Sequence, residues 1–318
     1  MFPSYLRLVT PRYLFLLITV SSMLVTAGCK QQEPLTGKEL ASLLAEKIDI
    51  ILFDYHDANV AISIIDHSRN VVIHGDGNRL FHAASTMKVP VMIELYRQEA
   101  AGYLSLDDSL LVENQFRSIV DGSVYSIEDD SDDTIYDKLG SFMTMRELAY
   151  NMITVSSNLA TNLLIDRLSA DSVQATSERL GTLNAKTVRG VEDLKAFDQG
   201  LSNSMTSRDL AILMEAIRTG IAVSPASDQE MVELLLSQFF NSMISAGVPR
   251  EAKVAHKTGS ITSVHHDAAI IYPPEDDSFV LVVMTDGIED RIISSELGAR
   301  IAAAAYKVLR GPNPPDGN

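Results

Sequence analysis

The stretch Phe81-His82-Ala83-Ala84-Ser85-Thr86-Met87-Lys88-Val89-Pro90 places a Ser-x-x-Lys pattern at the start of an apolar segment. A serine hydroxyl is a poor nucleophile until a neighbouring base removes its proton. Lys88 follows Ser85 by three positions, so a helical turn brings both side chains to the same face. Pro90 lacks a backbone N–H, which predicts a tight or bent first turn of this helix. The pattern alone is not specific, because it also occurs on solvated helix faces.

Two further motifs follow along the chain. Ser156-Ser157-Asn158 lies within residues 145–168, whose apolar spacing predicts a helix. Lys257-Thr258-Gly259-Ser260 follows a short strand-like run at residues 252–256. Together with Ser-x-x-Lys they give, in order, the three motifs of the penicillin-recognising serine enzymes. The chain therefore resembles the class A serine β-lactamases and their close serine-hydrolase relatives over residues 37–310.

The resemblance implies an α/β (α+β) fold of the β-lactamase/transpeptidase type, with a five-stranded antiparallel sheet flanked by helices and an inserted all-α domain. The pattern agrees, since strands are predicted at residues 59–65, 71–73, 252–256, 268–272 and 279–284 and helices at 40–53, 205–219, 228–244 and 292–309. Strands at both ends of the chain indicate one sheet assembled from the two termini. We expect the sheet domain at residues 37–80 and 236–311, the all-α domain at 81–235 and the site in the cleft between them.

The resemblance also implies the roles of the motif residues in the reaction. Ser85 is the expected nucleophile, Lys88 its base and Ser156 the relay that protonates the leaving nitrogen. A lysine acts as a base only where burial or a neighbouring cation favours its neutral form. Asn158 is expected to bind both Lys88 and the side-chain amide of the substrate.

Substrate binding is assigned to the third motif. Lys257 is expected to place positive charge near a substrate carboxylate, and Thr258 to donate its hydroxyl to that group. Gly259 lets the strand edge approach closely. The backbone N–H groups of Ser85 and Ser260 are the expected oxyanion hole. The resemblance implies a reaction that needs no metal and no cofactor.

A second loop is expected to supply the base for hydrolysis of the acyl-enzyme. Relatives carry Glu-x-x-Leu-Asn there, whereas this chain reads Arg189-Gly190-Val191-Glu192-Asp193-Leu194-Lys195-Ala196. We assign the base to Glu192, with Asp193 as the next candidate. Leu194 comes one position early, and Ala196 stands where an asparagine helps to hold water in relatives. Asn162, one helical turn after Asn158, is expected to tie this loop to the helix.

Many relatives carry an arginine on the strand after Lys-Thr-Gly to grip the carboxylate. Here the strand reads Val264-His265-His266-Asp267. Neighbouring residues on a strand point to opposite faces, so the pair does not predict a metal site. One of them is expected to line the cleft in place of the arginine, and we assign His266. His82 is interpreted as a packed residue.

An acidic run at residues 128–133 is interpreted as a solvated loop. The run lacks the glycine that an EF-hand calcium loop requires, which disfavours a calcium site. The region is expected to shape the mouth of the site.

The N-terminus has the pattern of an export signal. Arg7 and Arg12 precede an apolar segment at residues 14–25 that is too short to span a bilayer comfortably. Thr26-Ala27-Gly28-Cys29 then resembles a lipoprotein processing site around the single cysteine. We expect a signal peptide at residues 1–28, lipidation of Cys29, a tether at 29–36 and a frayed tail at 312–318. The mature protein would be periplasmic or on the cell surface, held to a bacterial membrane by its lipid only.

The composition limits the partners of the protein. The chain has 318 residues, of which 46% are hydrophobic, and a formal net charge of −16. This charge argues against nucleic-acid binding, which needs a basic surface. We expect a monomer acting on a small β-lactam or a peptidoglycan-like peptide. Three activities share the acylation chemistry and stay open: a β-lactamase, a D-alanyl-D-alanine peptidase or other amide or ester hydrolase, and a penicillin-binding receptor that remains acylated.

Overall fold

A central antiparallel sheet organises the molecule. The computed structural model describes residues 34–311, so the predicted signal peptide, the lipidation site Cys29, most of the tether and the tail lie outside it. The sheet strands are β1 (Asn59–Asp66), β2 (Val71–Gly75), β9 (Lys253–Ile261), β10 (Val264–Tyr272) and β11 (Phe279–Asp286). Their order is β2-β1-β11-β10-β9, and every neighbouring pair is antiparallel. The predicted five-stranded sheet built from both ends of the chain is therefore confirmed.

All five strands are longer than the sequence pattern indicates, and β9 and β10 differ most from the predicted ranges. β9 continues through Lys257 to Ile261, so the third motif lies on the strand and not after it. β10 begins at Val264, because its first residues pair with the end of β9. Polar residues in β9 and β10 interrupt the apolar pattern on which the strand predictions rest. The backbone groups of these residues nevertheless pair with the neighbouring strand without a break.

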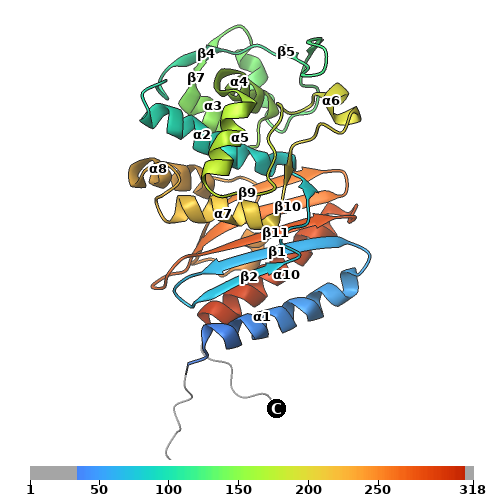
Figure 1. Ribbon diagram of the computed structural model, residues 1–318, viewed down its shortest axis with the longest axis vertical. Helices are drawn as coiled ribbons and strands as arrows, with labels where there is room; N and C mark the ends of the chain where they lie inside the picture. The colour runs from blue at the N-terminus through green and yellow to red at the C-terminus, as the bar shows by residue number, and fades with distance from the viewer. Residues whose placement is uncertain (1–33, 312–318) are drawn as a thin grey trace, which may run out of the picture. The chain divides into compact units, whose positions relative to one another are not determined.

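Helices cover both faces of the sheet, as Figure 1 shows. α1 (Gly37–Leu52) and α10 (Arg291–Arg310) pack on one face around a core that contains Leu44, Leu281 and Ile301. α1 begins at a capping box, in which Thr36 and Glu39 satisfy each other's backbone N–H groups. The opposite face carries the larger core, and α7 (Ser207–Arg218) packs directly on β1, β10 and β11 there.

Most of the remaining helices form a layer above α7 (Figure 1). They are α2 (Lys88–Ala100), α3 (Met145–Thr154), α4 (Asn158–Leu168), α5 (Ala170–Arg179), α6 (Leu194–Asp198) and α8 (Pro225–Leu236), with 3₁₀ helices η2 (Ala84–Met87) and η3 (Asp133–Lys138). The short α9 (Ile244–Gly247) packs against α10 instead, and the 3₁₀ helix η1 (Phe53–Tyr55) continues α1. Short strands pair as β3 (Phe81–His82) with β8 (Ser204–Met205), β4 (Ser109–Leu111) with β7 (Phe142–Thr144) and β5 (Phe116–Arg117) with β6 (Val124–Tyr125). Apolar side chains of this layer and of the sheet belong to one core, so the two predicted domains pack as a single unit.

Two helix predictions need correction. The stretch 145–168 is not one helix, because the backbone breaks at residues 155–157 between α3 and α4. The predicted helix at 228–244 ends at Leu236 and resumes only as the short α9. The tight first turn expected near Pro90 is confirmed, since the 3₁₀ helix η2 leads directly into α2.

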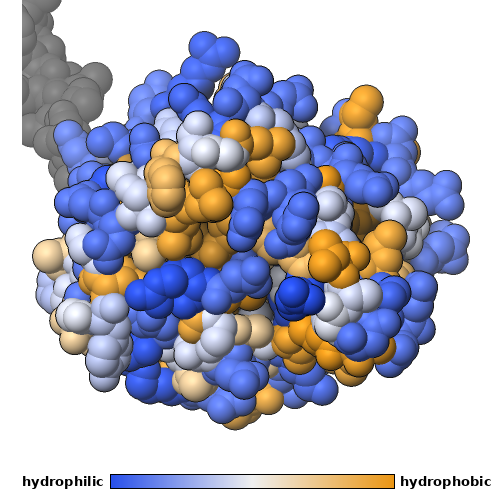
Figure 2. Space-filling model, turned by 90° about the horizontal axis from the view of Figure 1, so that it is seen from above, coloured by the Kyte–Doolittle hydropathy of each residue, from blue (hydrophilic) through white to orange (hydrophobic). Residues whose placement is uncertain are grey.

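The surface above the helical layer is mainly hydrophilic with separate apolar patches (Figure 2). No helix within residues 34–311 is both long and apolar enough to cross a membrane.

Candidate active site

Ser85 lies in η2, where the chain passes from β3 into α2. Gly259 of β9 packs against this turn. A Cβ atom at Gly259 would lie 2.9 Å from the backbone nitrogen of Ser85 and 2.8 Å from that of Thr86. Only a residue without a side chain lets the strand pass this close, so the glycine of the third motif positions β9 beside the nucleophile.

Two buried lysines converge on the hydroxyl of Ser156. The Nζ atom of Lys88 lies 3.2 Å from Ser156 Oγ, and that of Lys257 lies 3.0 Å from the same atom. Lys88 also donates to the carbonyl oxygen of Ser156 at 2.5 Å and to Asn158 Oδ1 at 2.8 Å. The structure therefore brings the predicted base, relay and carboxylate-binding lysine together from three separate segments.

Burial changes the protonation of both lysines. Burial lowers the pKa of Lys88 to about 7, although the negative charges of Asp130 and Glu192 act to raise it. The pKa of Lys257 lies well below its usual range, first because of burial and second because of the neighbouring Lys88 charge. A neutral amine in this site can accept a proton from a hydroxyl group.

Glu192 reaches the site through Asn158. Its Oε1 accepts a hydrogen bond from Asn158 Nδ2 at 2.8 Å, and its Oε2 accepts from the backbone N–H of Glu128 at 2.9 Å. Asn162 binds both backbone groups of Val191, the residue before Glu192. Its side chain accepts from Val191 N at 2.7 Å and donates to Val191 O at 3.0 Å. The expectation that Asn162 ties this loop to the helix is confirmed.

The second acid of the loop has a different place. Asp193 is 2% exposed and accepts hydrogen bonds from the hydroxyl of Ser118 and the backbone N–H of Ile119, both at 2.9 Å. It also caps α6 through Ala196 N. Asp193 therefore holds the loop together, which leaves Glu192 as the acid directed at the site.

The assignment of His266 to the cleft is wrong. His266 is fully buried, its Nε2 donates to the carbonyl oxygen of His82 at 2.9 Å, and its Nδ1 accepts from Thr285 N at 3.2 Å. Burial lowers the pKa of His266 to about 4, so it is neutral. Its neighbour His265 lines the cavity instead, together with Arg291 at the start of α10. His82 is half-buried, accepts from Ala84 N and packs edge-to-face against Phe197, and it also lines a cavity beside Ser85.

The histidine error follows from strand register. His266 pairs with Gly259, so both point toward η2, whereas His265 pairs with Ser260 on the other face. No sequence motif pointed to Arg291, which follows β11 at the start of α10 and lines the cavity as a cation together with His265.

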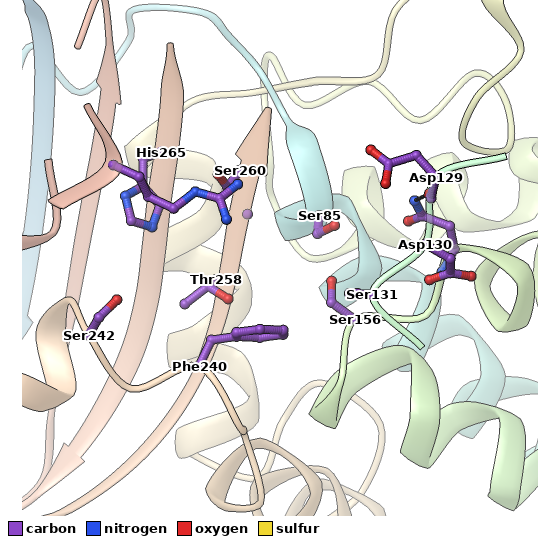
Figure 3. A pocket seen from close by; sticks show the side chains of 13 residues that line it. Ser85, Asp129, Asp130, Ser131, Ser156, Phe240, Ser242, Thr258, Ser260 and His265 are labelled. Carbon is purple, nitrogen blue, oxygen red and sulfur yellow. Dashed lines mark hydrogen bonds between the residues drawn. The ribbon is translucent and has the colours of Figure 1, made fainter. Parts of the chain in front are cut away.

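Two cavities meet at Ser85. The first has a volume of about 270 Å³ and ends in polar groups that include Thr258, Ser242, His265 and Arg291. Figure 3 shows Ser85 and Ser156 directed into it, between the sheet residues and the segment Asp129–Ser131. The second, of about 460 Å³, has apolar walls formed by Val191, Leu194, Phe197 and Ile261, with Glu192 and Asn158 beside them. The nucleophile thus separates a polar, cation-bearing cavity from a larger and more apolar one.

The acidic run is not a freely solvated loop. Asp130 accepts hydrogen bonds at the start of α4, and the 4%-exposed Asp132 accepts from Thr134 and Asn151. No group of three or more metal-binding side chains occurs in the part of the chain that the structure describes. The run therefore belongs to the wall of the site.

Three of the eight non-glycine residues with positive φ in the described part of the chain lie at the site. Ala84, Ser156 and Glu192 have φ angles of 45°, 61° and 59°. Residues with side chains rarely adopt this left-handed conformation, and they do so mainly where surrounding contacts enforce it. One such residue precedes the nucleophile, one is the relay and one is the loop acid.

Comparisons with known proteins agree with this geometry. The chain is 24% identical to beta-lactamase 3 of Bacillus cereus over 261 residues, covering 80% of this chain and 77% of that protein. It is 29% identical to the beta-lactamase of Bacillus licheniformis, where the match spans 48% of that protein's length.

Two solved structures are also similar. The beta-lactamase of Sphaerobacter thermophilus has a TM-score of 0.73 at 26% identity, covering 86% of this chain and 99% of that one. PBP-A has a TM-score of 0.74 at 25% identity, covering 85% and 96%. The model described as "Beta-lactamase enzyme family" matches residues 43–309. This chain, a serine hydrolase fold with all three motifs in one cleft, belongs to the beta-lactamase enzyme family.

Proposed function

We propose that this protein hydrolyses β-lactams through an acyl-enzyme on Ser85. The observation that carries the proposal is the convergence of two buried amines on Ser156 Oγ at 3.2 and 3.0 Å, in a cavity that Ser85 also lines. General-acid help to the leaving nitrogen and general-base help to the nucleophile both need such proton carriers within hydrogen-bond reach.

In the first half-reaction, Ser85 Oγ attacks the lactam carbonyl carbon and its proton passes to the neutral amine of Lys88. The backbone N–H groups of Ser85 and Ser260 stabilise the negative oxygen of the tetrahedral intermediate. Ser156 then gives its proton to the lactam nitrogen as the C–N bond breaks, and one of the two lysines restores that proton. The product is an ester on Ser85 with the ring opened.

The two cavities match the two arms of a penicillin. Arg291, His265 and Thr258 at the polar end suit its carboxylate, and the apolar cavity suits its acyl side chain. Lys257 adds positive charge beside the carboxylate end when it is protonated. These features support a bicyclic β-lactam over a neutral amide or ester as the substrate.

In the second half-reaction, Glu192 takes a proton from a water molecule that attacks the ester carbonyl carbon. The bond from this carbon to Ser85 Oγ then breaks, and Oγ takes up a proton in return, which frees Ser85 and releases the ring-opened acid. Two features favour a slow step. Ala196 is fully buried and cannot bind this water, and the α6 residues that line the cavity, Leu194 and Phe197, are apolar. This arrangement keeps a penicillin-binding receptor as the second candidate, because a receptor acylates and does not hydrolyse. A solved structure of a PBP-A variant holding penicillin G as an acyl-enzyme belongs to a similar chain, with a TM-score of 0.74 at 25% identity.

Mass spectrometry of the intact protein with benzylpenicillin over time tests the proposal. An adduct of one penicillin that forms and then decays supports a β-lactamase. An adduct that persists favours the receptor or a peptidase, and the absence of any adduct rejects both. Ser85→Ala is the matched control, since it removes one hydroxyl and should abolish the adduct.

A further inference from the structure

Asp130 holds the start of α4 from outside the helix. Its Oδ1 accepts the backbone N–H of Asn158 at 2.8 Å, and its Oδ2 accepts that of Leu159 at 2.9 Å. The first N–H groups of a helix have no partner within it, and negative charge is favourable there. A residue 28 positions upstream of Asn158 therefore fixes the first turn of α4.

That first turn of α4 carries the side-chain amide of Asn158, which links Lys88 to Glu192. Asn158 Oδ1 accepts from Lys88 Nζ at 2.8 Å, while Asn158 Nδ2 donates to Glu192 Oε1 at 2.8 Å and to Asp129 O at 2.9 Å. A shift of the first turn would move both contacts together, because one amide makes them.

The sequence of the second motif makes this contact informative. Related enzymes have Ser-Asp-Asn there, whereas this chain has Ser157 at the middle position. Ser157 caps α4 by accepting from Ala160 N at 3.2 Å, but a hydroxyl carries no charge. Asp130 supplies the carboxylate instead, and its Oδ2 lies 3.4 Å from the Ser157 hydroxyl.

The acidic loop is built to hold Asp130 in place. Tyr136 donates its hydroxyl to Asp130 Oδ2 at 3.2 Å, and Asp132 N donates to Oδ1 at 3.3 Å. Ser131 anchors the loop to the break before α4 by donating to the carbonyl oxygen of Val155 at 2.6 Å.

We propose that Asp130 is a positioning residue for the acylation of Ser85, which fixes Asn158 at the start of α4 and thereby places its carboxylate against the residue that binds the buried amine of Lys88. The inference rests on the function proposed above. The charged groups that face Lys88 are Asp130 of the loop, Glu192 and, from β9, Lys257. Among the groups that oppose the lowering of the Lys88 pKa by burial, Asp130 acts more strongly than Glu192.

A titration of Lys88 followed by NMR in lysine-labelled protein tests this without any substrate. The NMR resonance of the Lys88 side chain is identified as the one that disappears in Lys88→Met. Asp130→Asn keeps the shape of the side chain and one oxygen that can accept from one of the two backbone N–H groups, and Ser157 still caps α4, so the fold should survive. The titration midpoint of Lys88 should fall by about one pH unit when the charge is lost. Asp133→Asn removes the same charge from an exposed position of the loop and should leave the midpoint unchanged.

A rescue variant separates position from charge. Asp130→Ala removes both the cap and the charge, and adding Ser157→Asp returns a carboxylate to the start of α4. The double variant should recover the wild-type midpoint and most of the acylation rate. A midpoint that does not move in Asp130→Asn, or that stays lowered in the double variant, overturns the inference. If benzylpenicillin fails to label the wild type, the proposed function fails, whereas the titration still decides the role of Asp130.

Discussion

Lys88 and Lys257 direct their amine nitrogens at one atom, Ser156 Oγ, from 3.2 and 3.0 Å. Both side chains are fully buried. Two positive charges this close in a buried site repel each other, and burial penalises each of them. At least one amine is therefore neutral near pH 7, as a base that activates serine requires.

The acylation rate should follow the protonation of Lys88. Because the pKa of Lys88 in the folded protein is about 7, the neutral base dominates above that pH and declines tenfold per unit below it. The rate of Ser85 labelling by a fluorescent penicillin should rise with pH up to about 7 and then level off. Lys88→Arg keeps a permanent charge and should label poorly at every pH. A rate independent of pH in the wild type would exclude Lys88 as the base.

Gly259→Ala should damage both stability and acylation. The new methyl group would lie 2.9 Å from Ser85 N and 2.8 Å from Thr86 N, so η2 or β9 must move. Overpacking of this kind costs about 1–3 kcal/mol of the free energy of unfolding, measurable by urea denaturation. Gly75→Ala is the matched control, because its nearest neighbouring atom lies 3.9 Å away and β2 can accept the methyl group. Equal stability of the two variants would contradict the packing argument.

Phe197→Ala should weaken recognition of an aromatic acyl side chain. Phe197 lines the apolar cavity and is 48% exposed, so a bound ring would cover it. Loss of about 1 kcal/mol of apolar contact corresponds to a roughly fivefold lower acylation efficiency with benzylpenicillin. 6-Aminopenicillanic acid, which lacks the side chain, should react unchanged. Phe142→Ala in β7 is the control, since Phe142 lies outside both cavities. An equal loss with both substrates would place the acyl side chain elsewhere.

The motifs could be predicted from the sequence because each one is local. Ser85 and Lys88 share one turn, and Lys257 to Ser260 share one strand. Their meeting with Ser156 followed only from the family resemblance, since the hydrogen bonds join residues 68 and 101 positions apart. Helical periodicity could not show the break at Ser156, because α3 and α4 both bury apolar residues and together imitate one helix.

The errors concern features set by distant partners. Alternation along β10 predicts that only one of His265 and His266 faces the cleft, but the choice depends on the register with β9. The acidic run has the composition of a solvated loop, and its contacts with α4 depend on tertiary packing. Arg291 follows no motif and lies far along the chain from the other site residues.

Cys29→Ser should release the protein from membranes. The residues around Cys29 lie outside the described part of the chain, so this prediction rests on the sequence Thr26-Ala27-Gly28-Cys29 alone. Lipidation needs the thiol, and a serine cannot replace it. Fractionation of cells should find the wild type with membranes and the variant in the soluble export fraction. Lys30→Ser, which alters only the tether, should remain with membranes. A variant that is exported and cleaved but still sediments would refute the anchor.

Glu192→Gln should separate the two half-reactions. Glu192 accepts from Asn158 Nδ2 and from Glu128 N, so a glutamine can satisfy only one of these donors with its single oxygen. The variant keeps Ser85, Lys88 and Ser156 but loses the base for water, and such general-base help is worth about 10²–10⁴-fold. The acyl-enzyme should therefore persist much longer, while acylation stays within about tenfold of the wild type, well below that range.

The wild type itself should show a burst of product followed by slow turnover, because Ala196 leaves the water poorly held. Rapid-mixing kinetics with a chromogenic cephalosporin measures both phases in one experiment. If acylation slows as much as deacylation, Glu192 acts on the nucleophile through Asn158 and Lys88. If neither rate changes, Glu192 is not the base, and the receptor becomes the better description of this protein.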